Sequence, residues 1–186
     1  MGNTGKRMIA VCGKGGVGKT AFTAMLSIAL LESGKAGKLL LIDADPALGL
    51  TNALGIKIEK TMGQVREEII HAAKAGNKTE LEEMVGMVDY MLLEALVEED
   101  NLALLAMGRS NSIGCFCSVN VVLREAMTAL SQKFDTMVID GEAGLEQINR
   151  QVMRELDYLI ILTDTSARGL QTVALLHDMV EGKKVS

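Results

Sequence analysis

The 186-residue sequence has no tryptophan and a single proline, and aromatic residues make up only 3% of it. A core built from this chain must therefore be aliphatic, and the 48% hydrophobic content is sufficient for one domain. Positive charge is also scarce, because 19 lysines and arginines face 24 acidic residues, which gives a net charge of −5. Nonspecific binding to nucleic acid needs a basic face, so this balance argues against a nucleic-acid partner.

Long apolar runs are missing as well. No run approaches the roughly 20 residues that a membrane-spanning helix needs, and residues 1–6 are not followed by the apolar core of a signal peptide. The sequence therefore predicts a cytoplasmic protein without a membrane partner. It contains only three cysteines, and in that compartment we expect them to be metal ligands or buried thiols rather than disulfide partners.

Short apolar runs alternate with helical patterns along the chain. The runs that could be buried parallel strands cover residues 8–12, 39–42, 102–107, 136–139 and 158–162. The helical patterns cover residues 21–32, 61–76, 120–132 and 166–180, and residues 79–82 could open a further helix. Strands joined by helical crossovers predict an α/β fold with a doubly wound, mainly parallel sheet and helices on both faces. Residues 1–186 are expected to form a single domain.

The strongest motif lies between the first predicted strand and the first predicted helix. It fits the phosphate-binding pattern G-x-x-x-x-G-K-[ST] and consists of Gly13, Lys14, Gly15, Gly16, Val17, Gly18, Lys19 and Thr20, followed by Ala21. Backbone N–H groups of such a loop turn inward onto phosphate oxygens, and the following helix adds the positive end of its dipole. We therefore predict that these residues bind a nucleotide, that Lys19 neutralises its β- and γ-phosphates and that Thr20 ligates Mg²⁺.

Acidic residues follow two of the predicted strands. Asp43 and Asp45 come after residues 39–42, and Asp140 comes after residues 136–139. Ligands of an open α/β sheet lie beyond the carboxyl ends of its strands, so these acids are candidates for the same site. Asp140 has the position of a Walker B aspartate, which orders the waters around Mg²⁺, and Asp43 is predicted to contact those waters too. The alternative for each acid is a solvated side chain at a strand end.

The early lysine of the loop, Lys14, is typical of the deviant P-loop ATPases, and the loop resembles that group, which includes the Min and ParA ATPases and the nitrogenase iron protein. The resemblance implies a homodimer with ATP between the subunits, in which Lys14 reaches the partner subunit's ATP. It also implies that Asp45 orients the attacking water and that the N–H of Gly144 contacts the γ-phosphate. Lys14, Lys19 and Asp45 are thus the predicted catalytic residues, although Lys14 could instead be an ordinary surface lysine.

Cys115 and Cys117 form a C-x-C pair between the third predicted strand and the helix predicted from Asn120. This position lies on the nucleotide side of the sheet, next to a helix N-terminus that favours the thiolate. Two ligands are too few for a closed metal site, but two subunits would supply four thiolates, which suit Zn²⁺, Ni²⁺ or a [4Fe–4S] cluster. Two buried cysteines or a redox pair within one subunit are the alternatives.

Several stretches of the chain resemble the CooC-type ATPases, which insert nickel during the maturation of carbon monoxide dehydrogenase. These stretches are residues 11–20, 43–50, 107–109, 114–120 and 140–146. The resemblance implies an ATP-hydrolysing metallochaperone whose C-x-C pairs hold one Ni²⁺ or Zn²⁺ at the dimer interface. It also implies a nickel enzyme as client, such as carbon monoxide dehydrogenase, and an acetyl-CoA synthase is equally compatible with these residues.

Two other functions stay open at this point. The first is an electron-transfer ATPase that carries a [4Fe–4S] cluster, although residues 140–147 lack the second cysteine position of the nitrogenase iron protein. The second is a metal-free positioning ATPase, which would need a basic or amphipathic targeting surface, whereas residues 173–181 have no cationic face. Proteins of this kind normally continue beyond the position of Ser186, so we expect the sequence to lack the last strands of the sheet.

Overall fold

A computed structural model describes residues 6–74, 83, 86–109, 117–141 and 156–180. Within these ranges, six strands form one sheet in the order β3-β4-β2-β5-β1-β6. The strands are β1 (Arg7–Gly13), β2 (Leu39–Asp43), β3 (Leu96–Glu99), β4 (Leu102–Ala106), β5 (Thr136–Asp140) and β6 (Tyr158–Leu162). All neighbouring strands run parallel except β3, which pairs antiparallel with β4 at one edge. The predicted mainly parallel α/β sheet is confirmed.

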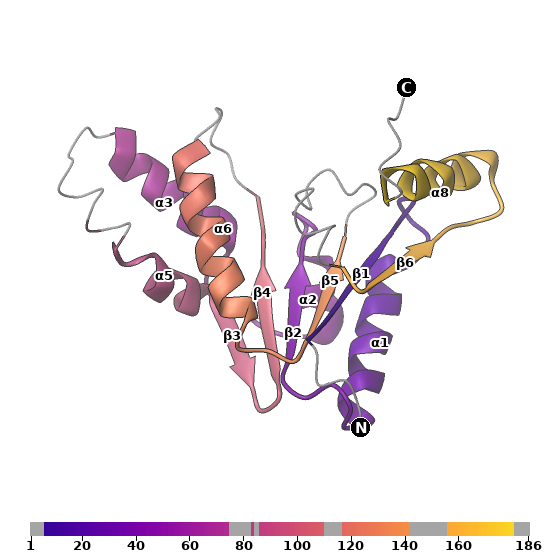
Figure 1. The fold of residues 1–186 in the computed structure, drawn as a ribbon, viewed down its shortest axis with the longest axis horizontal. Helices are drawn as coiled ribbons and strands as arrows, with labels where there is room; N and C mark the ends of the chain where they lie inside the picture. The colour runs from indigo at the N-terminus through magenta and orange to yellow at the C-terminus, as the bar shows by residue number, and fades with distance from the viewer. Residues whose placement is uncertain (1–5, 75–82, 84–85, 110–116, 142–155, 181–186) are drawn as a thin grey trace.

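Helices cover both faces of this sheet (Figure 1). They are α1 (Lys19–Glu32), α2 (Gly49–Leu54), α3 (Met62–Lys74), α5 (Val88–Ala95), α6 (Cys117–Ser131) and α8 (Ala167–Val180). Alternate residues of a strand point to opposite faces, so Leu40 and Ile42 lie in one core cluster and Leu39 and Leu41 in another. The first cluster includes residues of α3, α5, α6 and α8, and the second includes residues of α1 and α2. The core is therefore aliphatic on both sides of the sheet, apart from Phe134 in the first cluster.

Three elements, β3, α2 and α5, have no counterpart in the sequence prediction. β3 has a single buried residue, Leu96, and exposes Glu98 and Glu99, so it lacks the apolar run that marks a buried strand. A two-residue turn joins β3 to β4, and its first residue, Asp100, has a φ of 40°. α2 has six residues, which is too short for helical periodicity to be visible in the sequence.

The other differences concern the ends of elements. α6 begins at Cys117, three residues before the predicted start at Asn120, so Cys117 is the first residue of a helix instead of part of the loop before it. α5 is a further helix that the sequence prediction did not contain, and the helix opening expected at residues 79–82 lies outside the described residues. No helix within the described ranges is long and apolar enough to cross a membrane.

The register of the parallel strands brings acidic side chains together at the carboxyl end of the sheet. Asp43, the last residue of β2, pairs directly with Asp140, the last residue of β5. Asp140 also pairs with Val11 of β1, two residues before the glycine-rich loop begins. The loop and both aspartates therefore lie together at the carboxyl end of the strands, as expected for a ligand site of an open α/β sheet.

Candidate nucleotide-binding site

The glycine-rich loop connects β1 directly to α1. Gly13 has a φ of 138°, and a Cβ atom there would lie 1.9 Å from the carbonyl oxygen of Leu162, so only glycine fits between β1 and β6. Gly18 precedes α1 with a φ of 90°, a left-handed conformation that also favours glycine. No side chain in the described structure caps α1, so the N–H groups of its first turn have no side-chain acceptor. The helix start thus offers an anion backbone donors that no side chain caps.

The two lysines of the loop have different partners. The Lys19 amine folds back over the loop and donates to the carbonyl oxygen of Lys14 at 3.3 Å. The Lys14 amine instead extends to the loop after β6, where it lies 2.5 Å from Asp164 Oδ2 and 3.1 Å from Ser166 Oγ. The hydrogen bonds from Lys14 and then Ser166 lower the pKa of Asp164 to about 2. Lys14 is thus held within its own chain by an ionised carboxylate.

Asp140 is a buried carboxylate with one oxygen unpaired. Its Oδ1 accepts a hydrogen bond from the Thr23 hydroxyl at 3.1 Å, whereas Oδ2 is buried and has no hydrogen-bond partner in the described structure. Burial raises the pKa of Asp140, the hydroxyls of Thr20 and Thr23 act in the opposite direction, the charge of Asp43 raises it further and the charge of Lys19 lowers it. A buried acid in this condition is costly unless a cation compensates its charge.

Asp43 is equally buried but has its hydrogen bonds satisfied. Its Oδ2 accepts from the Thr51 N–H at 2.9 Å and from the Thr51 hydroxyl at 2.8 Å, and its Oδ1 accepts from the Asp45 N–H at 3.1 Å. These bonds tie the end of β2 to α2 and to the turn between them. Asp43 therefore fixes the local backbone, and its predicted contact with the waters around Mg²⁺ stays a prediction.

Asp45 and Thr20 approach each other beside Gly49, the first residue of α2. A Cβ atom at Gly49 would lie 3.2 Å from Asp45 Oδ2 and 3.3 Å from Thr20 Oγ1. Asp45 Oδ1 accepts the Ala47 N–H at 2.8 Å, which holds the carboxylate in the turn and leaves Oδ2 on the Thr20 side. A side chain at position 49 would crowd both oxygen atoms. The small residue therefore keeps open the space between them.

The oxygen atoms around this space are the kind of ligand that Mg²⁺ prefers. Hydroxyl and carboxylate oxygens are hard donors, and Mg²⁺ in phosphate sites keeps several waters that such groups can order. The unpaired Asp140 Oδ2 and the Thr20 hydroxyl beside Gly49 both fit this chemistry. The donor set at the carboxyl end of β5 and the start of α1 is thus suited to a magnesium ion.

The predicted thiolate site is only partly covered by the described residues. Cys115 and Gly144 lie outside them, and of Cys117 the structure describes only its place at the start of α6. Cys12 lies fully buried in β1, and burial raises its pKa to about 11, which agrees with an inert core thiol. Among the residues that the structure describes, no group of three or more histidine, cysteine or acidic side chains could hold a metal ion.

The segment that leads toward the cysteines begins beside the nucleotide-side acids. The Met107 N–H, just after β4, donates to the carbonyl oxygen of Asp43 at 2.8 Å, and the Gly63 N–H donates to the Met107 carbonyl oxygen at 2.8 Å. A Cβ atom at Gly63 would lie 2.2 Å from the Arg109 carbonyl oxygen, so the start of α3 packs tightly on this segment. The backbone at Asp43 is therefore in direct contact with the segment that precedes the C-x-C pair.

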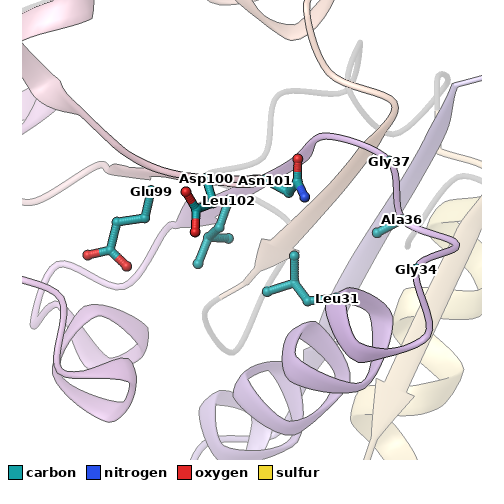
Figure 2. A pocket seen from close by; sticks show the side chains of 8 residues that line it. All are labelled: Leu31, Gly34, Ala36, Gly37, Glu99, Asp100, Asn101 and Leu102. Carbon is teal, nitrogen blue, oxygen red and sulfur yellow. The ribbon is translucent and has the colours of Figure 1, made fainter.

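A hollow of about 390 Å³ lies at the opposite end of the sheet (Figure 2). It is lined by the end of α1 and by the turn between β3 and β4, and Figure 2 labels its residues, among them Leu31, Gly34, Asp100 and Asn101. None of the loop residues 13–20 lines it. This hollow is therefore separate from the predicted nucleotide site.

Three residues of the site have no part in the sequence prediction. Asp164 follows the fifth predicted strand, residues 158–162, so the strand-end rule that selects Asp43 and Asp140 would also have found it. Thr23 and Gly49 carry no such signal. Their roles depend on which face of α1 turns inward and on how closely α2 approaches Thr20, and neither can be read from a pattern.

Comparison with known families identifies the fold. The model of the AAA domain family matches residues 6–185. The chain belongs to this family. An uncharacterised ATP-binding protein of Methanocaldococcus jannaschii is 44% identical to it over 181 residues, which cover 96% of this chain and 70% of the relative. The carbon monoxide dehydrogenase accessory protein CooC of Rhodospirillum rubrum is 32% identical over 183 residues, which cover 92% of this chain and 68% of CooC.

Solved structures similar to this AAA domain share its fold. Cobyrinic acid a,c-diamide synthase of Mycobacterium smegmatis, solved with an ATP analogue and magnesium, has a TM-score of 0.65 at 23% identity, and the match covers 95% of this chain and 68% of the synthase. A Cyanothece McdA–ATP complex has a TM-score of 0.64 at 24% identity, and the match covers 97% of this chain and 65% of McdA. The chain thus spans about two thirds of the length of these structures. The predicted P-loop fold class is confirmed.

Proposed function

We propose that this protein binds and hydrolyses ATP with Mg²⁺ at the loop of residues 13–20. The observation that carries the proposal is the buried Asp140, whose unpaired Oδ2 lies at the carboxyl edge that the glycine-rich loop also occupies. A cation near the unpaired oxygen of a buried carboxylate stabilises it, and the phosphate loop is where a nucleotide would bring Mg²⁺. The relatives named as ATP-binding proteins support the same nucleotide.

The residues of the site have separate roles in this proposal. The backbone N–H groups of residues 13–21 cradle the phosphates, and Lys19 offsets the charge of the β- and γ-phosphates. Thr20 would ligate Mg²⁺, and Asp140 and Asp43 would order the waters around it; when bound there, the ion would supply positive charge beside the phosphates. Asp45 orients the attacking water. The backbone N–H of Gly144 donates a hydrogen bond to the γ-phosphate.

We also propose that the protein acts as a homodimer, with Lys14 reaching the partner subunit's ATP. Lys14 pairs with Asp164 and Ser166 of its own chain in the structure. Contact with the partner's phosphates would therefore exchange one ionised partner for another. Asp164 is exposed and Lys14 is partly exposed, so solvent screens this pair and the exchange costs little.

The cargo of the dimer is a thiophilic metal ion, Ni²⁺ or Zn²⁺, held by Cys115 and Cys117 of both subunits. Support comes from the C-x-C pair itself and from the similarity to an accessory protein of carbon monoxide dehydrogenase. The bonds among Asp43, Met107 and Gly63 connect the nucleotide edge with the segment before these cysteines. A nickel enzyme such as carbon monoxide dehydrogenase is the client of this metallochaperone.

Metal content tests the cargo. We would measure metal and acid-labile sulfide in anaerobically purified protein, with and without ATP and Mg²⁺, beside the double variant Cys115→Ser/Cys117→Ser. Cys12→Ala is the matched control, because Cys12 is the third cysteine of the chain, is buried in β1 and is not part of the C-x-C motif. We expect one Ni²⁺ or Zn²⁺ per dimer, lost in the double variant and kept in the control.

Other outcomes would point to the alternatives. Four iron and four sulfide per dimer would indicate an iron–sulfur electron-transfer ATPase. Intact ATP hydrolysis with no metal in any state would contradict the metallochaperone and favour a metal-free positioning ATPase.

A further inference from the structure

Thr23 is a buried polar residue on the inner face of α1. It lies one helical turn beyond Thr20, and residues three or four apart share a helix face. Its side chain is completely buried, and its hydroxyl lies 3.1 Å from Asp140 Oδ1. The phosphate-binding pattern ends at Thr20, so Thr23 is not part of that motif.

The Thr23 hydroxyl has two acceptors within reach but only one hydrogen. Besides Asp140 Oδ1, it lies 2.9 Å from the Lys19 carbonyl oxygen, the ordinary acceptor for a threonine inside a helix. If the hydrogen pointed to Lys19, a hydroxyl lone pair would face the buried carboxylate. A bond to an ionised acceptor is also stronger than one to a neutral carbonyl. The Thr23 hydroxyl hydrogen is therefore better directed toward Asp140 Oδ1 than toward the Lys19 carbonyl oxygen.

We propose that Thr23 is a positioning residue for the magnesium site, which acts by holding Asp140. Its bond to Oδ1 fixes the orientation of the carboxylate, so the unpaired Oδ2 is the oxygen left for the waters around Mg²⁺. This inference rests on the proposed function, because Asp140 orders those waters only if a magnesium nucleotide binds. A pre-oriented carboxylate binds more tightly than one that must be ordered on binding.

Ser27 provides a matched control one turn further along α1. It is also buried, and its hydroxyl donates to the Thr23 carbonyl oxygen at 2.7 Å. Ser27→Ala and Thr23→Val both remove a buried hydroxyl from the same face of the same helix. Of the two hydroxyls, that of Thr23 is the one bonded to Asp140. An effect confined to Thr23→Val therefore reports on Asp140 and not on helix packing.

The test is a Mg²⁺ titration of the binding of a fluorescent ATP analogue, with thermal unfolding as a check that each variant is folded. For Thr23→Val we expect the Mg²⁺ concentration at half-saturation to rise about tenfold, as for the loss of one hydrogen bond to a charged group. Binding of the analogue in EDTA should stay unchanged. Thr23→Ser, which keeps the hydroxyl, should restore the Mg²⁺ response, and Ser27→Ala should match the wild type.

Three results would overturn the inference. The first is an unchanged Mg²⁺ half-saturation in Thr23→Val, and the second is an equal effect of Thr23→Val in EDTA and in Mg²⁺. The third is an equal rise in half-saturation in Ser27→Ala. Each leaves the proposed nucleotide function intact, because the wild type still binds the analogue with Mg²⁺. A wild type that does not respond to Mg²⁺ at all would overturn the proposed function and this inference together.

Discussion

The two ends of the sheet treat their aspartates differently. At the amino end, Asp135 and Asp157 are exposed, and each accepts a backbone N–H, from Lys38 at 2.8 Å and from Met8 at 2.7 Å. At the carboxyl end, Asp140 is buried and keeps one oxygen unpaired. The amino end also contains the hollow of Figure 2. The comparison teaches that a buried carboxylate with an unpaired oxygen, rather than a hollow, marks the end of the sheet where the nucleotide site is proposed.

The largest expected difference between the two ends concerns lysines. Lys19→Ala should lower the rate of ATP hydrolysis about 100-fold or more, because it removes the charge that offsets the transferred phosphate. Lys38→Ala, at the amino end, should leave the rate unchanged. Steady-state phosphate release measures both. Equal rates of ATP hydrolysis for Lys19→Ala and Lys38→Ala would contradict the proposal that the site lies at the carboxyl end of the sheet.

The aspartates should differ next. Asp140→Asn should weaken the Mg²⁺ dependence of nucleotide binding about tenfold, since a neutral amide orders the waters around Mg²⁺ less well. Asp135→Asn should leave that dependence unchanged and lower the free energy of unfolding by about 1 kcal/mol, because it weakens the bond from the Lys38 N–H. Mg²⁺ titrations and urea unfolding separate these effects. A Mg²⁺ effect in Asp135→Asn would contradict the assignment of the site to the carboxyl end.

The smallest expected effect concerns the ion pair of Lys14. Asp164→Asn should raise the association constant of the ATP-dependent dimer about two- to fivefold. The substitution weakens the ion pair with Lys14, which competes with the phosphates of the partner subunit's ATP. Asp157→Asn, at the other end of the sheet, is the control. Sedimentation with ATP and Mg²⁺ measures the association. A weaker dimer in Asp164→Asn would show that this pair supports the interface instead of competing with it.

The sequence predicts the parts of the fold that depend on apolar runs. All five predicted strands form because each supplies a run of apolar residues. β1, β2, β4 and β5 are largely buried, whereas β6, predicted as a buried strand, is the edge strand beside β1 and has no buried residue. β3 escapes prediction because two of its four residues are the exposed Glu98 and Glu99, so it has no apolar run, unlike the other edge strand, β6. α2 escapes because it is short and is preceded by Leu48 in a left-handed conformation, with a φ of 60°. Elements that lack an apolar run or a helical periodicity of their own depend on tertiary contacts that no local pattern encodes.

The candidate site divides in the same way. The glycine-rich loop is predictable because its spacing is a direct consequence of wrapping a phosphate, and Asp43 and Asp140 are predictable because they end strands. The ion pair between Lys14 and Asp164 could not be predicted, since these residues are 150 positions apart in the sequence. The difference between the two buried aspartates could not be predicted either. Both oxygens of Asp43 accept hydrogen bonds, whereas Asp140 Oδ2 accepts none, and this depends on how α1 and α2 pack on the sheet.

Calorimetric titration of the protein with ATP, in Mg²⁺ and in EDTA, tests the central claim most directly. If the carboxyl end of the sheet is a magnesium-nucleotide site, one ATP should bind per chain, Mg²⁺ should tighten binding, and Lys19→Ala should abolish it. Absence of binding by the folded wild-type protein in Mg²⁺, or equal binding by Lys19→Ala, would contradict the claim.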